Sequence, residues 1–144
     1  MLATYQTEQE INSQRDETQV AVIEDRLQQN LKDISFEKPY DLVIARWGLG
    51  YLSDEEVYEF LNKARTKLLA HSHNRQAGCM IFMETVQDED KQAEMMGEQN
   101  LTLRPRQQYL DMFESCKFEV KMKETIDVRE DYYPDVIFCV VPRT

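Results

Sequence analysis

The sequence predicts a mixed α/β fold built on a mainly parallel sheet. Two apolar strand runs, Tyr40–Ala45 and Cys79–Glu84, are each followed further along the chain by an amphipathic helical pattern. Strands that alternate with helices in this way pack side by side in parallel. Two later strand runs, Phe118–Val128 and Val136–Val141, follow each other without a helix between them. They therefore predict a closing hairpin in which one strand runs antiparallel to the others.

The chain is expected to begin with a polar arm and to continue as one α/β domain. Residues 1–19 are rich in Gln and Glu and predict a weak helix or a disordered arm, whereas residues 20–144 carry the apolar runs. At the start of this domain, Val20–Glu24 is β-branched and fits a strand. A helical interpretation competes with it, because Leu27 and Leu31 lie four residues apart.

The first well-marked unit is a strand, a turn and a helix. Tyr40–Ala45 is apolar throughout, which is typical of a parallel strand buried on both faces. The turn Trp47–Gly50 contains two glycines, and Ser53 with Glu56 then forms a capping-box signature. In open α/β sheets, ligands bind where a strand ends and the chain turns into a helix. The helix is expected to bury one apolar stripe, formed by Val57, Phe60, Leu61, Ala64 and Leu68.

The second half repeats this pattern. Cys79–Glu84 predicts another buried strand, and Gln87–Gln99 shows no periodicity and is expected to be a loop. Pro105 fits the first turn of a helix whose apolar side is formed by Tyr109, Met112, Phe113 and Cys116. In the next strand Phe118, Val120 and Met122 are expected to share one face.

Composition narrows the possible partners. The chain has 144 residues, and none of its apolar runs approaches the length of about 18 residues that a membrane span needs. A net charge of −10 argues against a nucleic acid as the main partner. The acidic surface could bind a basic protein, or it could only keep the chain soluble. The three cysteines show no paired spacing and His71 and His73 lack further ligands, so we expect reduced thiols and no metal site.

The element order is similar to the C-terminal half of class I, S-adenosylmethionine-dependent methyltransferases, which have a Rossmann-like sheet. More narrowly, the chain resembles the alpha-N-terminal protein methyltransferase family, which methylates the α-amino group of proteins that begin with Xaa-Pro-Lys. The resemblance covers about residues 26–142. It rests on Leu31–Ile34, Tyr40–Leu61, Phe82–Thr85 and Tyr133–Val141, and the second of these segments is the most specific.

The resemblance implies a cofactor site and a substrate site. Leu31 and Lys32 fall on the segment that flanks the adenine of S-adenosylmethionine in the family, and Arg46 replaces a glutamine that contacts this cofactor. Trp47 matches the tryptophan that lines the substrate peptide channel. Tyr51 replaces a histidine that lies near the reacting amine in the family, which makes it the candidate catalytic residue. Thr85 replaces an asparagine that holds the first residue of the peptide.

The front part of the family pattern is absent from this sequence. None of the glycines forms the GxGxG motif that cradles the methionine part of the cofactor, and the acidic residue that holds the ribose is also absent. Without the first strands of the sheet, Tyr40–Ala45 is expected to have an open edge. Three explanations stay open: the chain is half of a larger protein, another chain covers the edge, or the fold has been rearranged.

Two functions follow as expectations. In the first, the chain belongs to a cytoplasmic or nuclear enzyme that transfers a methyl group to the α-amine of a basic protein N-terminus, with the cofactor half supplied. In the second, it is a catalytically inactive methyltransferase-like scaffold or assembly subunit that binds a protein chain along the open edge. Trp47, Arg46 and Tyr51 also have plain structural interpretations as a core aromatic, an ion-pairing cation and a packed hydroxyl. Glu84 is a further candidate, because it lies at the end of a strand.

Overall fold

The structure is a computed structural model that describes residues 31, 34, 39–69, 78–97, 100–126 and 133–143. The predicted arm 1–19, the segment Val20–Glu24, the two histidines and Lys32 lie outside this part of the chain. The described elements, in chain order, are β1 (Leu42–Arg46), η2 (Leu49–Tyr51), α2 (Asp54–Lys63), the π-helix η3 (Ala64–Leu69), β2 (Cys79–Gln87), β3 (Glu94–Met96), β4 (Leu101–Pro105), α3 (Arg106–Ser115), β5 (Phe118–Ile126) and β6 (Asp135–Pro142).

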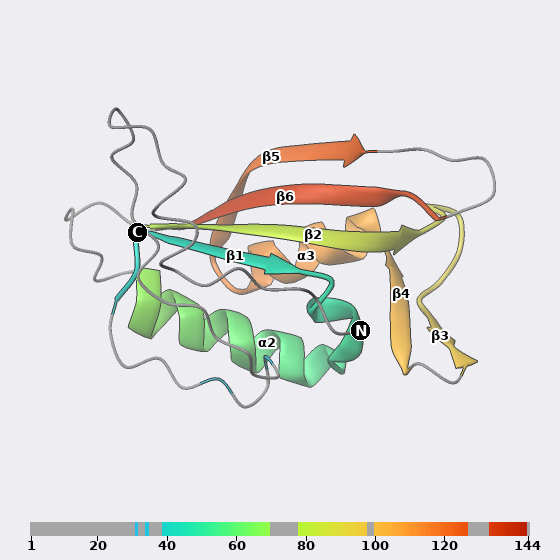
Figure 1. Cartoon of the computed structure of the whole chain (residues 1–144), viewed down its shortest axis with the longest axis horizontal. Helices are drawn as coiled ribbons and strands as arrows, with labels where there is room; N and C mark the ends of the chain where they lie inside the picture. The colour runs from blue at the N-terminus through green and yellow to red at the C-terminus, as the bar shows by residue number, and fades with distance from the viewer. Residues whose placement is uncertain are drawn as a thin grey trace, which may run out of the picture.

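The sheet is mixed, with β2 at its centre (Figure 1). β2 pairs in parallel with β1 and, at its carboxyl end, with β4, while β6 pairs antiparallel with both β2 and β5. The predicted closing hairpin is therefore confirmed. As expected of a mainly parallel sheet with one reversed strand, β1, β2, β4 and β5 run in the same direction and β6 runs against them. The short strand β3, which pairs antiparallel with β4, was not expected. β3 lies in the segment that was expected to be a loop.

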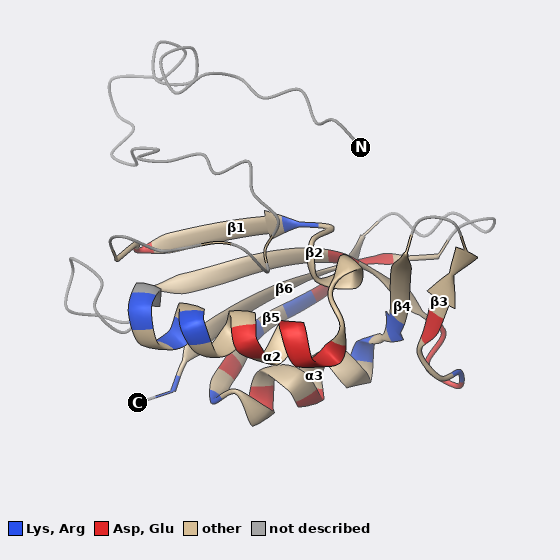
Figure 2. Ribbon diagram, turned by 90° about the horizontal axis from the view of Figure 1, so that it is seen from below, with Lys and Arg blue, Asp and Glu red and all other residues tan. Residues whose placement is uncertain are grey.

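The helices α2 and α3 cover the same face of the sheet and enclose an aromatic core (Figure 2). Phe82 of β2 stacks on Phe113 of α3 with ring centroids 5.6 Å apart, and Phe138 of β6 meets Phe113 edge-on at 5.3 Å. The predicted stripes are confirmed for the buried side chains Val57, Phe60, Leu61, Ala64, Tyr109, Met112, Phe113 and Cys116. No helix in the described part of the chain is long and apolar enough to span a membrane.

The predicted capping box at the start of α2 is present. The Ser53 hydroxyl accepts from the Glu56 N–H at 3.2 Å, and the Glu56 carboxylate accepts from the Ser53 N–H at 3.0 Å. We expect Ser53→Ala to lower the free energy of unfolding by about 1 kcal/mol, because one N–H of the first turn loses its partner. Urea denaturation measures this loss, and Ser53→Asp is the matched control that keeps an acceptor and is expected to retain most of the stability. Equal losses in both variants contradict the prediction.

Two expectations about strand faces were wrong. β1 was expected to be buried on both faces, but among its residues only Ala45 is buried, while Leu42 is 48% and Ile44 is 68% exposed. In the described part of the chain β1 pairs with β2 alone, and the predicted open edge stays a prediction. In β5 a bulge between Val120 and Met122 shifts the register, and Met122 is therefore exposed rather than aligned with Phe118 and Val120.

Candidate active site

The chain turns sharply where β1 ends, at the carboxyl edge of the sheet. Trp47 has a φ of 54°, in the left-handed region that non-glycine residues seldom adopt. Its N–H donates to the carbonyl oxygen of Met83 on β2 at 2.8 Å. The short helix η2 follows directly and leads into α2. Such backbone strain persists only where the surroundings fix it, and it occurs often at functional sites.

Glu84 of β2 holds the turn through its backbone N–H groups. The side chain is 1% exposed, and its Oε1 accepts from the N–H of Gly48 at 3.2 Å and from the N–H of Leu49 at 2.8 Å. Burial raises the pKa of this carboxyl from its ordinary 4.5 to about 7, although the N–H groups of the turn and the positive charge of Arg104 act in the opposite direction. Glu84 therefore titrates near neutral pH.

Arg104 of β4 holds the same turn through its carbonyl groups. Its side chain is fully buried, and it donates from Nη1 to the Leu49 oxygen at 2.9 Å and from Nη2 to the Leu52 oxygen at 2.6 Å. Its Nε donates to Oδ1 of Asp54, at the start of α2, at 2.9 Å. A guanidinium presents its donors in a fixed planar fork, so these contacts fix the relative positions of β4, the turn and α2.

Tyr109 of α3 is buried close to the charged groups of Glu84 and Arg104. The guanidinium carbon of Arg104 lies 5.7 Å from the centre of its ring. Burial, followed by the negative charge of Glu84, raises the pKa of the Tyr109 hydroxyl above its ordinary value, while Arg104 lowers it. Tyr109 therefore stays neutral and contributes to the apolar surroundings that raise the pKa of Glu84.

The structure brings four of the predicted site residues to this turn. The guanidinium of Arg46 lies 3.9 Å above the ring of Trp47, a cation–π contact. The indole Nε1 of Trp47 is buried and has no hydrogen-bond partner among the described residues. Leu31 packs against Gly48: a Cβ added at Gly48 would lie 2.5 Å from the Cδ1 atom of Leu31. Tyr51 is 52% exposed on the outer side of the turn.

Thr85 lies next to Glu84 on β2, but its hydroxyl is already engaged. It donates to Oδ1 of Asp135 on β6 at 2.6 Å. Successive strand residues point to opposite faces, so Thr85 and Glu84 act on different sides of the sheet. The expected role of Thr85 in holding a peptide stays a prediction.

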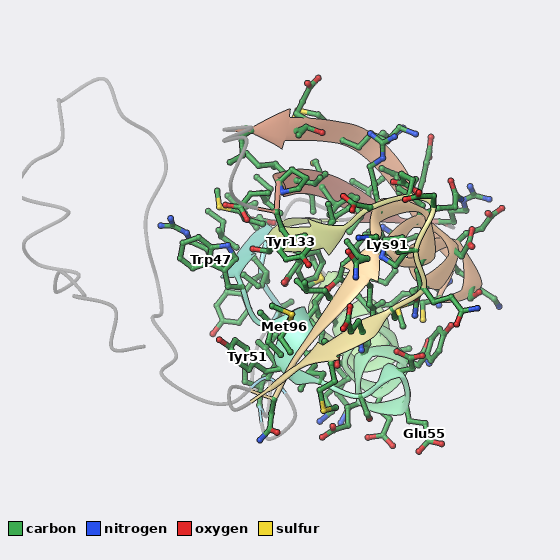
Figure 3. The ribbon with its side chains drawn as sticks, turned by 90° about the vertical axis from the view of Figure 1, so that its right-hand side faces the viewer. Trp47, Tyr51, Glu55, Lys91, Met96 and Tyr133 are labelled. Atoms are coloured by element: carbon green, nitrogen blue, oxygen red, sulfur yellow. The ribbon has the colours of Figure 1, made fainter. Side chains whose placement is uncertain are left out.

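Sequence reasoning missed Arg104, Met96 and Tyr133 at this end of the sheet. Figure 3 views the carboxyl ends of β1 and β2 and shows Trp47, Tyr51, Met96 and Tyr133 around them. Met96 is 38% and Tyr133 is 37% exposed, so both contribute apolar surface on the side of the molecule that Figure 3 shows. For Arg104 a signal existed: it is a single charge in the strand-like run Leu101–Pro105, which is typical of a buried functional or structural arginine.

A hollow of about 240 Å³ opens beside the carboxyl end of β2. It is lined by Val86, Gln87, Asp88, Glu89, Arg106, Thr125, Pro134 and Val136. Arg106 pairs with Glu89 across its rim at 3.4 Å, with both side chains largely exposed. The residues that the structure describes hold no cluster of His, Cys, Asp and Glu suited to a metal ion.

Comparison with solved structures places this site within a known fold, although no family model and no curated protein matches the sequence. A SAM-dependent methyltransferase of Leishmania major is similar, with a TM-score of 0.64, 19% identity and coverage of 76% of this chain and 42% of that one. The 1,6-didemethyltoxoflavin-N1-methyltransferase of Burkholderia thailandensis, solved with S-adenosylhomocysteine, has a TM-score of 0.61, 8% identity and coverage of 79% and 48%. A methyltransferase of Clostridium acetobutylicum has a TM-score of 0.57, 10% identity and coverage of 81% and 63%.

Three of the residues that the resemblance assigns to a cofactor or substrate site lie close together in the structure. Arg46 and Trp47 lie at the carboxyl end of β1, and Leu31 packs beside them against Gly48. The printed sequence has no GxGxG motif. The chain also spans less than half the length of the first two structures that it matches. The described part of the chain thus has a partial class I, S-adenosylmethionine-dependent methyltransferase fold, with a mixed, Rossmann-like sheet.

Proposed function

We propose that this chain forms the substrate-facing half of an S-adenosylmethionine-dependent methyltransferase that acts on a protein α-amine. The observation that carries the proposal is the turn after β1. Buried side chains hold it at the carboxyl edge of the sheet, where it presents Trp47 and exposed Tyr51. This is the edge at which α/β sheets of this kind bind their ligands. The fold neighbours support methyl transfer, and the resemblance to the alpha-N-terminal family supports the choice of amine.

The proposal assigns contacts with the cofactor, the peptide and the reacting amine to different residues. S-adenosylmethionine, when bound, supplies an electrophilic methyl group. Arg46, Leu31 and Lys32 would hold this cofactor, by resemblance, and Trp47 would line the path of the peptide. Tyr51 orients the amine, which must be neutral to react, through its hydroxyl. Positioning of this kind is the main contribution that an enzyme makes to such a displacement.

The open edge of β1 is where the cofactor half would pair. Leu42 and Ile44 are exposed on this strand. Its only charged residue is Arg46, its last, and Asp41 directly precedes it; Figure 2 accordingly shows red before the strand and blue at its tip. An exposed apolar edge strand is a template for pairing with another strand. A glycine-rich segment or partner chain at this edge would complete the sheet. The same edge favours the second candidate function, an inactive scaffold that binds a protein partner there.

Isothermal titration calorimetry with S-adenosylhomocysteine tests the proposal. Because the described residues form one wall of the site, we expect binding between about −4 and about −8 kcal/mol, which corresponds to about millimolar to about micromolar dissociation constants. Arg46→Ala is expected to weaken it roughly tenfold, through loss of about 1.4 kcal/mol. Lys123→Ala, on the exposed surface of β5, is the matched control and is expected to bind normally.

The outcomes separate the two functions. Binding that depends on Arg46 supports the enzyme, and methylation of Xaa-Pro-Lys peptides in the presence of the cofactor half is then the next assay. A folded, monodisperse chain that does not bind S-adenosylhomocysteine contradicts cofactor binding by this wall and favours the scaffold. Equal binding by both variants contradicts the role given to Arg46.

A further inference from the structure

We propose that Glu84 and Arg104 are positioning residues, which act together through the turn that they enclose. In this proposal they fix Gly48–Leu52 so that Trp47 and Tyr51 keep their places at the substrate edge. The inference rests on the proposed function, because the side chains that are held in place, Trp47 and Tyr51, are those proposed to contact the substrate. Neither residue is catalytic, because both are buried beneath the turn and neither reaches the edge of the sheet.

The first support is the direction of the contacts. The carboxylate of Glu84 accepts from two N–H groups of the turn, and the guanidinium of Arg104 donates to two of its carbonyl oxygens. Leu49 is held by both residues, through its N–H at 2.8 Å and through its oxygen at 2.9 Å. The turn is therefore fixed from β2 and from β4 at once. Neither of these charges forms a close ion pair with the other.

The second support is the strained backbone that the contacts hold in place. Three consecutive N–H groups, of Trp47, Gly48 and Leu49, all donate to acceptors on β2: the Met83 oxygen and the Glu84 carboxylate. Trp47 keeps a φ of 54° under this arrangement. Without these acceptors a bulky residue would leave the left-handed region readily. The acceptors on β2 thus determine where the indole of Trp47 points.

The third support is the close approach of β4. A Cβ added at Gly50 would lie 2.5 Å from Cδ1 of Leu101 and 3.4 Å from the backbone oxygen of Thr102. These residues belong to the strand that carries Arg104. Arg104 also reaches Asp54 at the first position of α2, so the turn, β4 and the helix are joined by one side chain. Tyr51 sits on the segment that these contacts enclose.

Trp47 itself provides the test, because it is the chain's single tryptophan. Its acrylamide quenching and fluorescence anisotropy are measured in the full chain without cofactor or substrate. Glu84→Gln keeps an oxygen acceptor for the two N–H groups, whereas Glu84→Leu keeps the bulk without an acceptor. At about pH 8 the Gln variant is expected to match the wild type, and the Leu variant to show roughly twofold greater quenching. Glu124→Gln, on the exposed surface of β5, is the control.

The comparison distinguishes positioning from general stability. Urea denaturation of each variant reports its fold, and the quenching is read under conditions in which every variant is fully folded. Arg104→Lys tests the other side of the turn, because it keeps the charge but loses the planar fork; it is expected to raise quenching as Glu84→Leu does. If Glu84→Leu quenches like Glu84→Gln, or Arg104→Lys like the wild type, the inference is overturned. Neither result depends on whether the chain binds S-adenosylhomocysteine or methylates a peptide.

Discussion

Arg104→Ala is expected to lower the free energy of unfolding by about 3 to 5 kcal/mol, the range for a broken buried charge network. The substitution leaves the carbonyl oxygens of Leu49 and Leu52 without their donor. It also leaves Glu84 buried without the positive charge that lowers its pKa. The cavity left by a fully buried guanidinium and its stem adds to this loss.

Chemical denaturation in urea measures the effect, with circular dichroism as the signal. Arg106→Ala is the matched control, two residues further along the chain. Arg106 pairs with Glu89 at the surface, where both side chains are 40% and 50% exposed. An exposed pair of this kind contributes about 0 to 1 kcal/mol. Similar losses in the two variants would show that the contacts of Arg104 do not stabilise the fold.

Local features of the fold were predictable because local sequence determines them. The capping box needs only Ser53 and Glu56, three residues apart, and the apolar stripe of α2 follows from helical spacing. The hairpin of β5 and β6 followed from the absence of a helix between two strand runs. The bulge after Val120 could not be predicted, since it leaves no distinctive residue in the sequence.

The candidate site was predictable only in part, because it is made by distant residues. The end of β1 and the turn around Trp47 carried their own signal in the glycines and in the resemblance. Glu84 was recognised as a strand-end carboxylate, but its partners Gly48 and Leu49 lie 36 and 35 residues away. The contacts of Arg104 with the turn span 55 and 52 residues. Pairing across such separations depends on sheet order, which the sequence patterns do not determine.

Glu84→Gln is expected to change how stability depends on pH. The pKa of Glu84 is raised to about 7 in the folded chain, from an ordinary value of 4.5, so the folded state binds this proton more tightly than the unfolded state. Its contribution to stability is therefore fully present below about pH 4.5 and is lost as the pH rises through about 7. The groups that face Glu84 are the N–H groups of the turn, Arg104 of β4 and Tyr109 of α3, with Asp54 beyond Arg104.

The glutamine variant isolates this contribution, because its side chain is neutral throughout and still accepts from Gly48 and Leu49. Below about pH 4.5 we expect similar stabilities, whereas at about pH 8 the variant should be more stable by about 3 kcal/mol. Urea denaturation across this range measures the difference, and Glu124→Gln corrects for general charge effects in this acidic chain. A difference in stability that does not change with pH would mean that folding does not raise the pKa of Glu84. A difference of the expected size would mean that a glutamine serves folding better than the carboxylate does.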